Sequence, residues 1–198
     1  MKKLFRTMLI IAIVILAIWI GLTIWVEIPK GNTITHLGEQ NAPQKALIVY
    51  NPDPLYNLDE QVCNAFAQEL AQHNIYTTVA TIKASREAHF NEKDFDLYVF
   101  CANTYNWRPD WPTNYFVKEI TELKNKKAVA ITLGSGSTAA SKAAFEKTIN
   151  KHCNNLLFSE TYWLMRPNDE ERMKEKNVLV AIDQAKSLAK KTAAIITP

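Results

Sequence analysis

One stretch of the sequence decides the fold: residues 95–109 read FDLYVFCANTYNWRP. Its first seven residues are almost all apolar or aromatic, which favours a strand that is buried on both faces of a sheet. Residues 102–110 are rich in Asn, Thr, Tyr and Trp instead, which predicts a loop after that strand. The stretch therefore predicts a buried strand that delivers polar and aromatic side chains to one edge of a sheet.

Four similar strands are expected on either side of this stretch. Short runs of apolar or β-branched residues predict them at residues 45–50, 75–82, 128–133 and within 156–165. Each run ends at Gly, Pro, Asn or a comparable turn residue, which is where a strand of this length is expected to stop.

Helical patterns fill the intervals between these strands. The first begins at Asn57, with Glu60 in capping-box position, and ends near residue 74. A second, long helix is predicted from Pro112 through residue 123, and a third over residues 140–149. A terminal helix is predicted from Asn168, with Glu171 in capping-box position, to about residue 191.

Strands that alternate with crossover-length helices predict an α/β fold with a doubly wound, five-stranded parallel sheet. Sheets of this kind bind ligands in the crevice outside the carboxyl ends of the strands, where the strand order reverses. Three predicted loops lie at that edge, at residues 51–57, 102–110 and 134–137. They are the candidate ligand-binding segments.

The N-terminal segment predicts a membrane anchor. Residues 8–26 carry no charge and would span about 28 Å as a helix, which matches the hydrocarbon core of a bilayer. A cleavable signal peptide would have a shorter apolar run that ends in small residues, whereas Trp19 and Trp25 lie within this one. A buried helix of a soluble core is the alternative reading of the run.

Charges at the two ends of this helix predict its orientation. Lys2, Lys3 and Arg6 precede the span, so we expect a cytoplasmic N-terminus and an extracytoplasmic domain in a single-pass protein of the cell membrane. The predicted organisation is a flank and anchor at 1–28, a polar linker at 29–44 and one domain at 45–198. The chain has a formal net charge of +3, which those three residues supply, so nucleic acid is not an expected partner.

Metal and redox motifs are missing from the sequence. Cys63, Cys101 and Cys153 lie far apart without a C-x-x-C pattern, and the four His residues are scattered, so no metal site is predicted. The cysteines are expected to be small core residues, with a disulfide as the alternative if the domain faces an oxidising space. Hydrolase and Walker A patterns are also missing, because the Gly134 loop matches neither spacing.

Residues 45–194 resemble the flavodoxin family, most specifically in the stretch quoted at the outset. It is similar to the family's third strand, its flavin-contacting loop with a central Thr-Tyr, and the Arg-Pro before the next helix. The resemblance implies the strand order 2-1-3-4-5, a noncovalently held FMN and electron transfer without a metal. The residues that match the three loops of the FMN site are Asn51, Tyr56, Asn57, Asn103, Thr104, Tyr105, Asn106, Trp107, Gly134, Ser135 and Gly136.

The side-chain types in these loops suit a flat aromatic cofactor. Tyr105 and Trp107 are expected to pack on ring faces, while Asn103, Thr104 and Ser135 are expected to meet ring-edge atoms. An aromatic cluster that closes the end of the sheet is the alternative role of the two large aromatic residues.

The first loop departs from the family pattern. Flavodoxins hold the FMN phosphate in a loop rich in Thr, Ser and Gly, whereas residues 51–57 read NPDPLYN. Its two prolines lack N–H donors and Asp53 adds a negative charge, so FMN binding is weakened. Two hypotheses follow: a membrane-tethered FMN protein acting in electron transfer or in quinone or NAD(P)H-type reduction, with a redox partner or quinone nearby, or a domain that serves as a non-catalytic binding module of the cell envelope.

Overall fold

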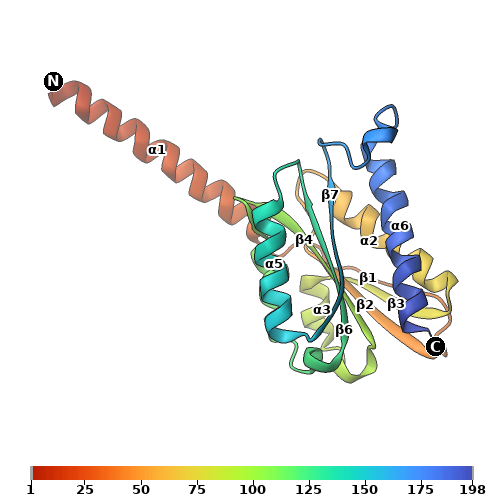
Figure 1. The fold of residues 1–198 in the computed structure, drawn as a ribbon. Helices are drawn as coiled ribbons and strands as arrows, with labels where there is room; N and C mark the ends of the chain where they lie inside the picture. Colours follow the sequence, from red (N-terminus) through yellow and green to blue (C-terminus); the bar gives the residue numbers. More distant parts are fainter. Residues whose placement is uncertain (1, 198) are drawn as a thin grey trace.

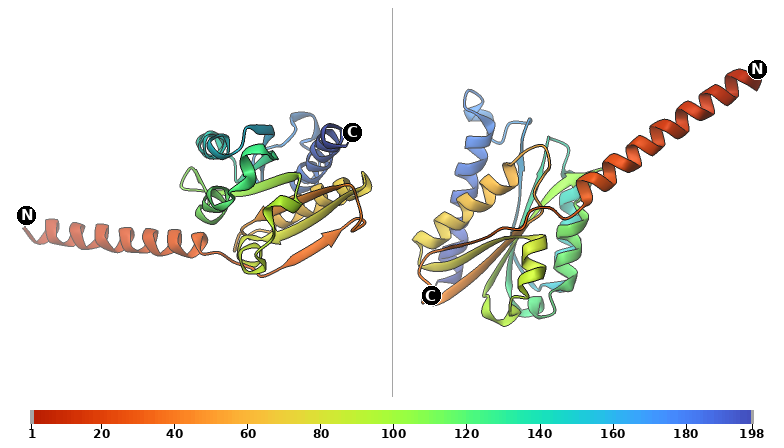
Figure 2. Two further views of the ribbon diagram at one scale, coloured as in Figure 1. Left: turned by 90° about the horizontal axis from the view of Figure 1, so that it is seen from below. Right: turned by 180° about the vertical axis from the view of Figure 1, so that it is seen from behind.

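The centre of the sheet is formed by β2 (Gln44–Tyr50) and β4 (Leu97–Tyr105), which are apolar on both faces. Ala46 and Ile48 of β2 pack into one core, and Leu47 and Val49 pack into a second core on the opposite face. The computed structural model, which describes residues 2–197, accordingly has three layers, with helices on both sides of one sheet (Figures 1 and 2). Alternation along a strand buried on both faces produces this arrangement.

The order of the parallel strands is the predicted one. β3 (Ile75–Thr81) and β4 flank β2, and β6 (Lys127–Gly134) and β7 (Asn155–Trp163) follow on the β4 side. All four of these pairings are parallel. Numbered among the five parallel strands alone, the order is 2-1-3-4-5, which confirms the prediction.

Two further strands were not predicted. β1 (Ile34–Leu37) pairs antiparallel with β3 and lies within the segment 29–44 that the sequence predicted to be a linker. The side chains of β1 are mostly exposed, so the strand is held by main-chain pairing with β3. For the same reason, no apolar pattern in the sequence predicts it. β5 (Arg108–Pro109) pairs antiparallel with the end of β4, where only a loop was expected.

The helices divide between the two faces. One face carries α2 (Leu58–Gln72) and α6 (Asn177–Ile196), which pack against each other. The other face carries α3 (Ile82–Ala88), α4 (Trp111–Glu119) and α5 (Ala139–His152). Short 3-10 turns lie at η1 (Glu92–Asp94), η2 (Glu122–Asn125) and η3 (Glu170–Arg172).

Several predicted helix boundaries were wrong. Residues 82–88 form α3, which the sequence did not predict, and α4 stops at Glu119 so that Leu123 reaches the core from η2. The capping box at the start of α2 is not formed, because the Asn57 side chain accepts from Gln61 Nε2 at 2.6 Å and caps no backbone nitrogen.

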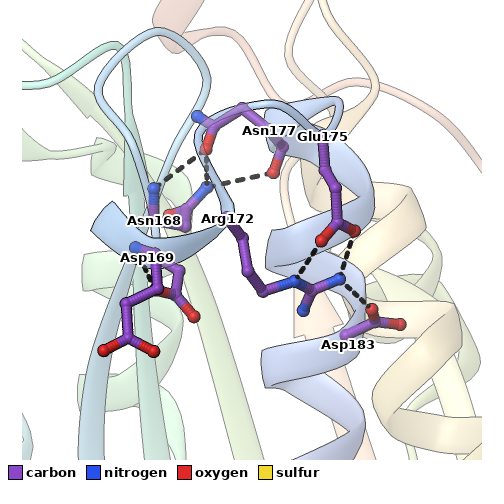
Figure 3. A network of polar contacts seen from close by, with 7 residues as sticks. Asn168, Asp169, Arg172, Glu175, Asn177 and Asp183 are labelled. Atoms are coloured by element: carbon purple, nitrogen blue, oxygen red, sulfur yellow. Dashed lines mark hydrogen bonds and ion pairs between the residues drawn. The ribbon is translucent and has the colours of Figure 1, made fainter.

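The terminal helix begins nine residues later than predicted, at Asn177. Asn168 does not cap it: the backbone nitrogen of Asn168 donates to Asn177 Oδ1 at 2.9 Å, and Asn168 Oδ1 accepts from Trp163 N at 2.7 Å. Figure 3 shows these asparagines beside Arg172, which pairs with Glu175 and with Asp183 of α6. A hydrogen-bonded loop therefore occupies residues 168–176 and includes the acidic residues that were expected to begin the helix.

The N-terminal helix α1 (Lys2–Glu27) projects away from the domain (Figures 1 and 2). It is long and apolar enough to span a membrane, and the residues of its apolar run are not buried against the rest of the chain. Its last turns still contact the domain, because Asn106 Nδ2 donates to Thr23 Oγ1 at 3.1 Å and Trp111 N donates to Glu27 Oε2 at 2.6 Å. The end of α1 is thus attached to the segment that follows β4.

Candidate functional site

A crevice of about 200 Å³ lies beyond the carboxyl ends of β2, β4 and β6. Six of the eleven residues predicted for a cofactor site line it: Tyr56, Asn103, Thr104, Tyr105, Gly134 and Ser135. Five residues outside the predicted cofactor set complete the wall: Asp53, Leu55, Leu58, Leu133 and Leu164. The crevice therefore lies at the place that the strand order dictates for a ligand.

The β4 and β6 side of the crevice is mostly apolar. Gly134 has no room for a side chain, since a Cβ there would lie 2.6 Å from Thr138 Cγ2 and 3.2 Å from Thr104 Cβ. The Thr104 hydroxyl is buried and has no hydrogen-bond partner among residues 2–197. We call one part of the crevice the ring end; it is formed by Thr104, Tyr105, Leu133, Gly134 and Ser135.

Asn106 and Trp107 lie outside the crevice because β4 continues further than expected. Tyr105 pairs with Arg108, so the two residues between them make a tight hairpin turn with φ values of +48° and +59°. Such two-residue turns need left-handed conformations at both positions. The turn leads Asn106 to its contact with Thr23 in α1 and leaves Trp107 61% exposed.

The first loop, residues 51–57, is closed by Asp53. Oδ1 of Asp53 accepts from the backbone nitrogens of Leu55 and Tyr56, at 2.7 and 2.9 Å. Its second oxygen accepts from the Tyr105 hydroxyl at 2.6 Å. Burial and this neighbouring carboxylate raise the pKa of Tyr105, so the phenol keeps the proton that it donates.

Asp59, in the first turn of α2, stabilises the first loop by a hydrogen bond to its backbone. It is 1% exposed, and its Oδ2 accepts from Asp53 N at 2.6 Å and from Asn103 Nδ2 at 2.9 Å. The same Asn103 amide donates to Asn51 O at 2.9 Å, which ties the ends of β2 and β4 together. Burial raises the pKa of Asp59, and the bonds that it accepts oppose this rise.

Asp110 is a second buried acid at this edge of the sheet. It caps α4 by accepting from Thr113 N at 2.9 Å, and it also accepts from Asn103 N at 2.8 Å. Burial raises the pKa of Asp110 to about 7. Sequence reasoning missed both Asp59 and Asp110, although Asp110 directly before Trp111-Pro112 has the pattern of a helix cap.

The remaining predicted residues also lie outside the crevice wall. Asn51 is fully buried, and its Oδ1 accepts from the backbone nitrogen of Lys30 at 2.9 Å. Asn57 is exposed at the start of α2. Gly136 lines a neighbouring cavity with Arg166. The structure therefore brings part of the predicted set together and places Asn51 against the segment that follows α1.

The comparisons with known proteins bear on the fold. No family model matches the chain, and no curated protein matches its sequence. Flavodoxin 1 from Bacillus cereus is 12% identical, with a TM-score of 0.58 over 78% of this chain and 100% of that chain. The fold is flavodoxin-like.

Other flavodoxin-like structures agree with this conclusion. An azoreductase from Bacillus anthracis is 10% identical, with a TM-score of 0.55 over 75% of this chain and 99% of that chain. The flavodiiron core of Flv1 from Synechocystis is 10% identical, with a TM-score of 0.59 over 80% of this chain and 38% of that chain. Flavodoxins bind FMN at this switch point of their own sheets.

The residues of the flavodoxin-like crevice fit the two parts of FMN differently. The ring end offers an apolar wall, an unpartnered hydroxyl at Thr104 and a tyrosine ring at Tyr105, which suit a flat aromatic ring. The first loop presents the Asp53 carboxylate, and no Lys, Arg or His is among the lining residues. The site thus fits the isoalloxazine ring and does not fit the phosphate.

Proposed function

We propose that this chain is a membrane-tethered, flavodoxin-like protein that binds a flavin in the strand-end crevice and transfers electrons at the membrane surface. The single observation that carries the proposal is the ring end, where Thr104, Tyr105 and Ser135 line an apolar crevice at the strand-order reversal. A bound flavin would supply the one- or two-electron chemistry. The chain itself would hold the ring, restrict water and keep the Tyr105 hydroxyl hydrogen-bonded to Asp53.

The anchor suits a partner within the membrane, such as a quinone. The contact of Thr23 with Asn106 attaches α1 to the β4–β5 hairpin, which includes the crevice residue Tyr105. The contact of Glu27 with Trp111 attaches α1 to the start of α4. An anchor attached there keeps the crevice near the bilayer surface. We propose a cytoplasmic N-terminus and an extracytoplasmic domain, following the basic residues before the span.

The exposed Trp107 supports this arrangement. It sits at the tip of the hairpin, level with the last turns of α1, and aromatic residues are enriched at membrane–water interfaces. A bulky residue at φ +59° is strained, which favours a functional reason for the aromatic side chain. We propose that Trp107 contacts the lipid headgroup region.

A second candidate function is favoured by the first loop. The Asp53 carboxylate lies where flavodoxins bind phosphate, as a domain without a flavin would allow. In that case the domain is a non-catalytic binding or interaction module of the cell envelope. The two candidates differ in whether the crevice binds a flavin at all.

The decisive experiment measures flavin binding by the full chain in detergent micelles. Absorption and fluorescence spectra are recorded before and after denaturation, and riboflavin and FMN are then titrated into the folded protein. Quenching of flavin fluorescence supports the proposal, and no binding of either compound favours the interaction module.

A matched pair of variants locates the binding. Ser135 is exposed and lines the crevice, so Ser135→Tyr fills it without disturbing the core. Ser137 is also exposed but lines the neighbouring cavity, so Ser137→Tyr is the control. Binding that is lost in the first variant and kept in the second places the flavin in the crevice.

A further inference from the structure

Between residues 52 and 56 the first loop has no free backbone donor left for a phosphate. Pro52 and Pro54 lack N–H groups, and the Asp53 nitrogen donates to Asp59 at 2.6 Å. The nitrogens of Leu55 and Tyr56 both donate to Asp53, at 2.7 and 2.9 Å. Every backbone nitrogen from residue 52 to residue 56 is therefore a proline nitrogen or a donor to a carboxylate of this chain.

The local charge is also of the wrong sign for a phosphate. Asp53 lines the crevice, with Asp59 bonded directly to its backbone. Lys30 interacts electrostatically with Asp53, and its ammonium donates to the carbonyls of Trp25, Val26 and Ile28 at the end of α1. Like charges repel strongly where water is partly excluded, so Asp53 would repel a phosphate placed next to it. No Lys, Arg or His lines the crevice to compensate for this repulsion.

Tyr105 holds the Asp53 carboxylate in place. Its hydroxyl donates to Asp53 Oδ2 at 2.6 Å, so Asp53 accepts three hydrogen bonds in all, two from backbone and one from a side chain. In a loop before a helix, backbone N–H groups commonly bind a phosphate, and here they bind the Asp53 carboxylate in the same manner. The side chain therefore acts as a built-in anion.

We propose that Asp53 takes the place of the phosphate in this crevice and selects a flavin whose side chain ends in a hydroxyl, of the riboflavin class, over its phosphate ester FMN. This inference rests on the proposed flavin binding. It makes Asp53 a specificity-determining residue, while the ring end supplies the affinity for the isoalloxazine.

The test compares riboflavin and FMN by fluorescence titration of the full chain in detergent micelles. At about pH 8 the FMN phosphate carries close to two charges. The expected result is that riboflavin binds at least about tenfold more tightly than FMN, a difference that corresponds to one unit in the logarithm of the dissociation constant. Equal or tighter binding of FMN overturns the inference but leaves the proposed function standing, whereas binding of neither compound overturns both.

Variants at Asp53 separate charge from loop geometry. Asp53→Ser frees the nitrogens of Leu55 and Tyr56 and is expected to raise FMN affinity at least about tenfold. Asp53→Asn keeps an acceptor for those nitrogens and removes only the charge, so it tests the selection even if the serine variant folds poorly. Glu60→Gln is the matched control, since Glu60 is exposed in the first turn of the neighbouring helix and carries the same charge.

The outcomes of the variants are distinct. A preference for riboflavin that shrinks in both Asp53 variants and persists in Glu60→Gln supports the selection by Asp53. A preference that is unchanged in Asp53→Asn, with thermal unfolding showing that the variant is folded, overturns it. Titration of Asp53→Ser with inorganic phosphate, followed by phosphorus NMR, gives a second readout that needs no flavin: phosphate binding that is gained over wild type supports the inference, and none overturns it.

Discussion

The first loop and the ring end line the same crevice but differ in how their polar groups are used. In the first loop, the Asp53 carboxylate accepts from the backbone nitrogens of Leu55 and Tyr56, and Asp59 accepts from the backbone nitrogen of Asp53. These three nitrogens are therefore satisfied without a ligand. At the ring end, the Thr104 hydroxyl has no partner within the described residues, and apolar side chains form the rest of the wall. The Asn51 Nδ2 atom at the start of the first loop is also buried without a partner within the described residues, so the two regions differ in their backbone donors and in their charge.

The difference shows that ligand specificity can change in the loops while the sheet stays the same. A flavodoxin-like sheet places its strand ends in the same way whatever the loops contain, because strand order and burial determine it. The loops then decide which part of a ligand is accepted. In this chain the loop after β2 has become a structural element, while the ends of β4 and β6 keep the form of a binding wall.

The largest effect is expected at the base of the first loop. Asp59→Ala leaves the Asp53 nitrogen, the Glu60 nitrogen and the Asn103 amide without their acceptor, and is expected to lower the free energy of unfolding by about 3 kcal/mol. Urea denaturation of the full chain in micelles measures this change. Glu60→Ala, on the exposed side of the same turn, is the control and is expected to stay within about 0.5 kcal/mol; equal effects of the two would refute a self-supporting loop.

The buried acids predict a pH dependence that the ring end cannot cause. The pKa of Asp110 is raised to about 7, so between about pH 4 and pH 7 the folded protein holds a proton that the unfolded chain has lost. The stability is therefore highest at low pH in this window and falls by about 1 kcal/mol per pH unit as the pH rises. Denaturation midpoints at several pH values measure the slope.

Asp110→Asn tests the source of this slope. The variant loses one acceptor and is expected to be about 1 kcal/mol less stable than wild type near pH 4, and this deficit is expected to shrink and reverse toward pH 7 because the variant has the flatter pH profile. An unchanged slope would assign the pH dependence to other groups.

A smaller effect is expected where the two regions meet. Tyr105→Phe removes the hydroxyl that donates to Asp53 and is expected to cost about 1.5 to 2 kcal/mol, the lower part of the range of about 1.5 to 3 kcal/mol for a hydrogen bond to a charged group. Tyr56→Phe is the matched control in the same crevice, because the Tyr56 hydroxyl makes no hydrogen bond to residues 2–197. Thermal unfolding of both variants decides whether the bond is needed to hold Asp53.

The smallest effect on stability is expected at the ring end. Thr104→Val removes an unpartnered hydroxyl and keeps the shape, so the free energy of unfolding should change by less than about 0.5 kcal/mol while flavin binding weakens. Thr192→Val, which removes a buried hydroxyl that donates to Leu188 O at 2.8 Å, is expected to cost about 1 kcal/mol and serves as the comparison. A large loss of stability in Thr104→Val would show that its hydroxyl has a structural role.

Sequence patterns predicted the parts of the fold that depend on burial. Residues 46–50 are apolar or aromatic at every position, so this run fits a strand covered on both faces, and five runs of apolar or β-branched residues predicted the sheet. The strand order was implied by the flavodoxin resemblance, and the structure confirms it. β1 could not be predicted in this way, because its four residues are mostly exposed and the strand depends on pairing with β3. The Asn106-Trp107 turn was missed because it has no Gly, the residue that usually marks such hairpins.

The candidate site divides along the same line. The sequence by itself determined which strand ends meet, because burial depends on residue type, and it therefore located Asn103, Thr104, Tyr105, Gly134 and Ser135 at one edge. Only the tertiary structure decided how the polar groups are paired there, because hydrogen bonds such as those of Asp53 and Asp59 depend on distances between residues that are not neighbours along the chain. The sequence alone showed the prolines and Asp53 of the first loop. Only the folded structure shows that Asp53 accepts the backbone hydrogen bonds that a phosphate would need.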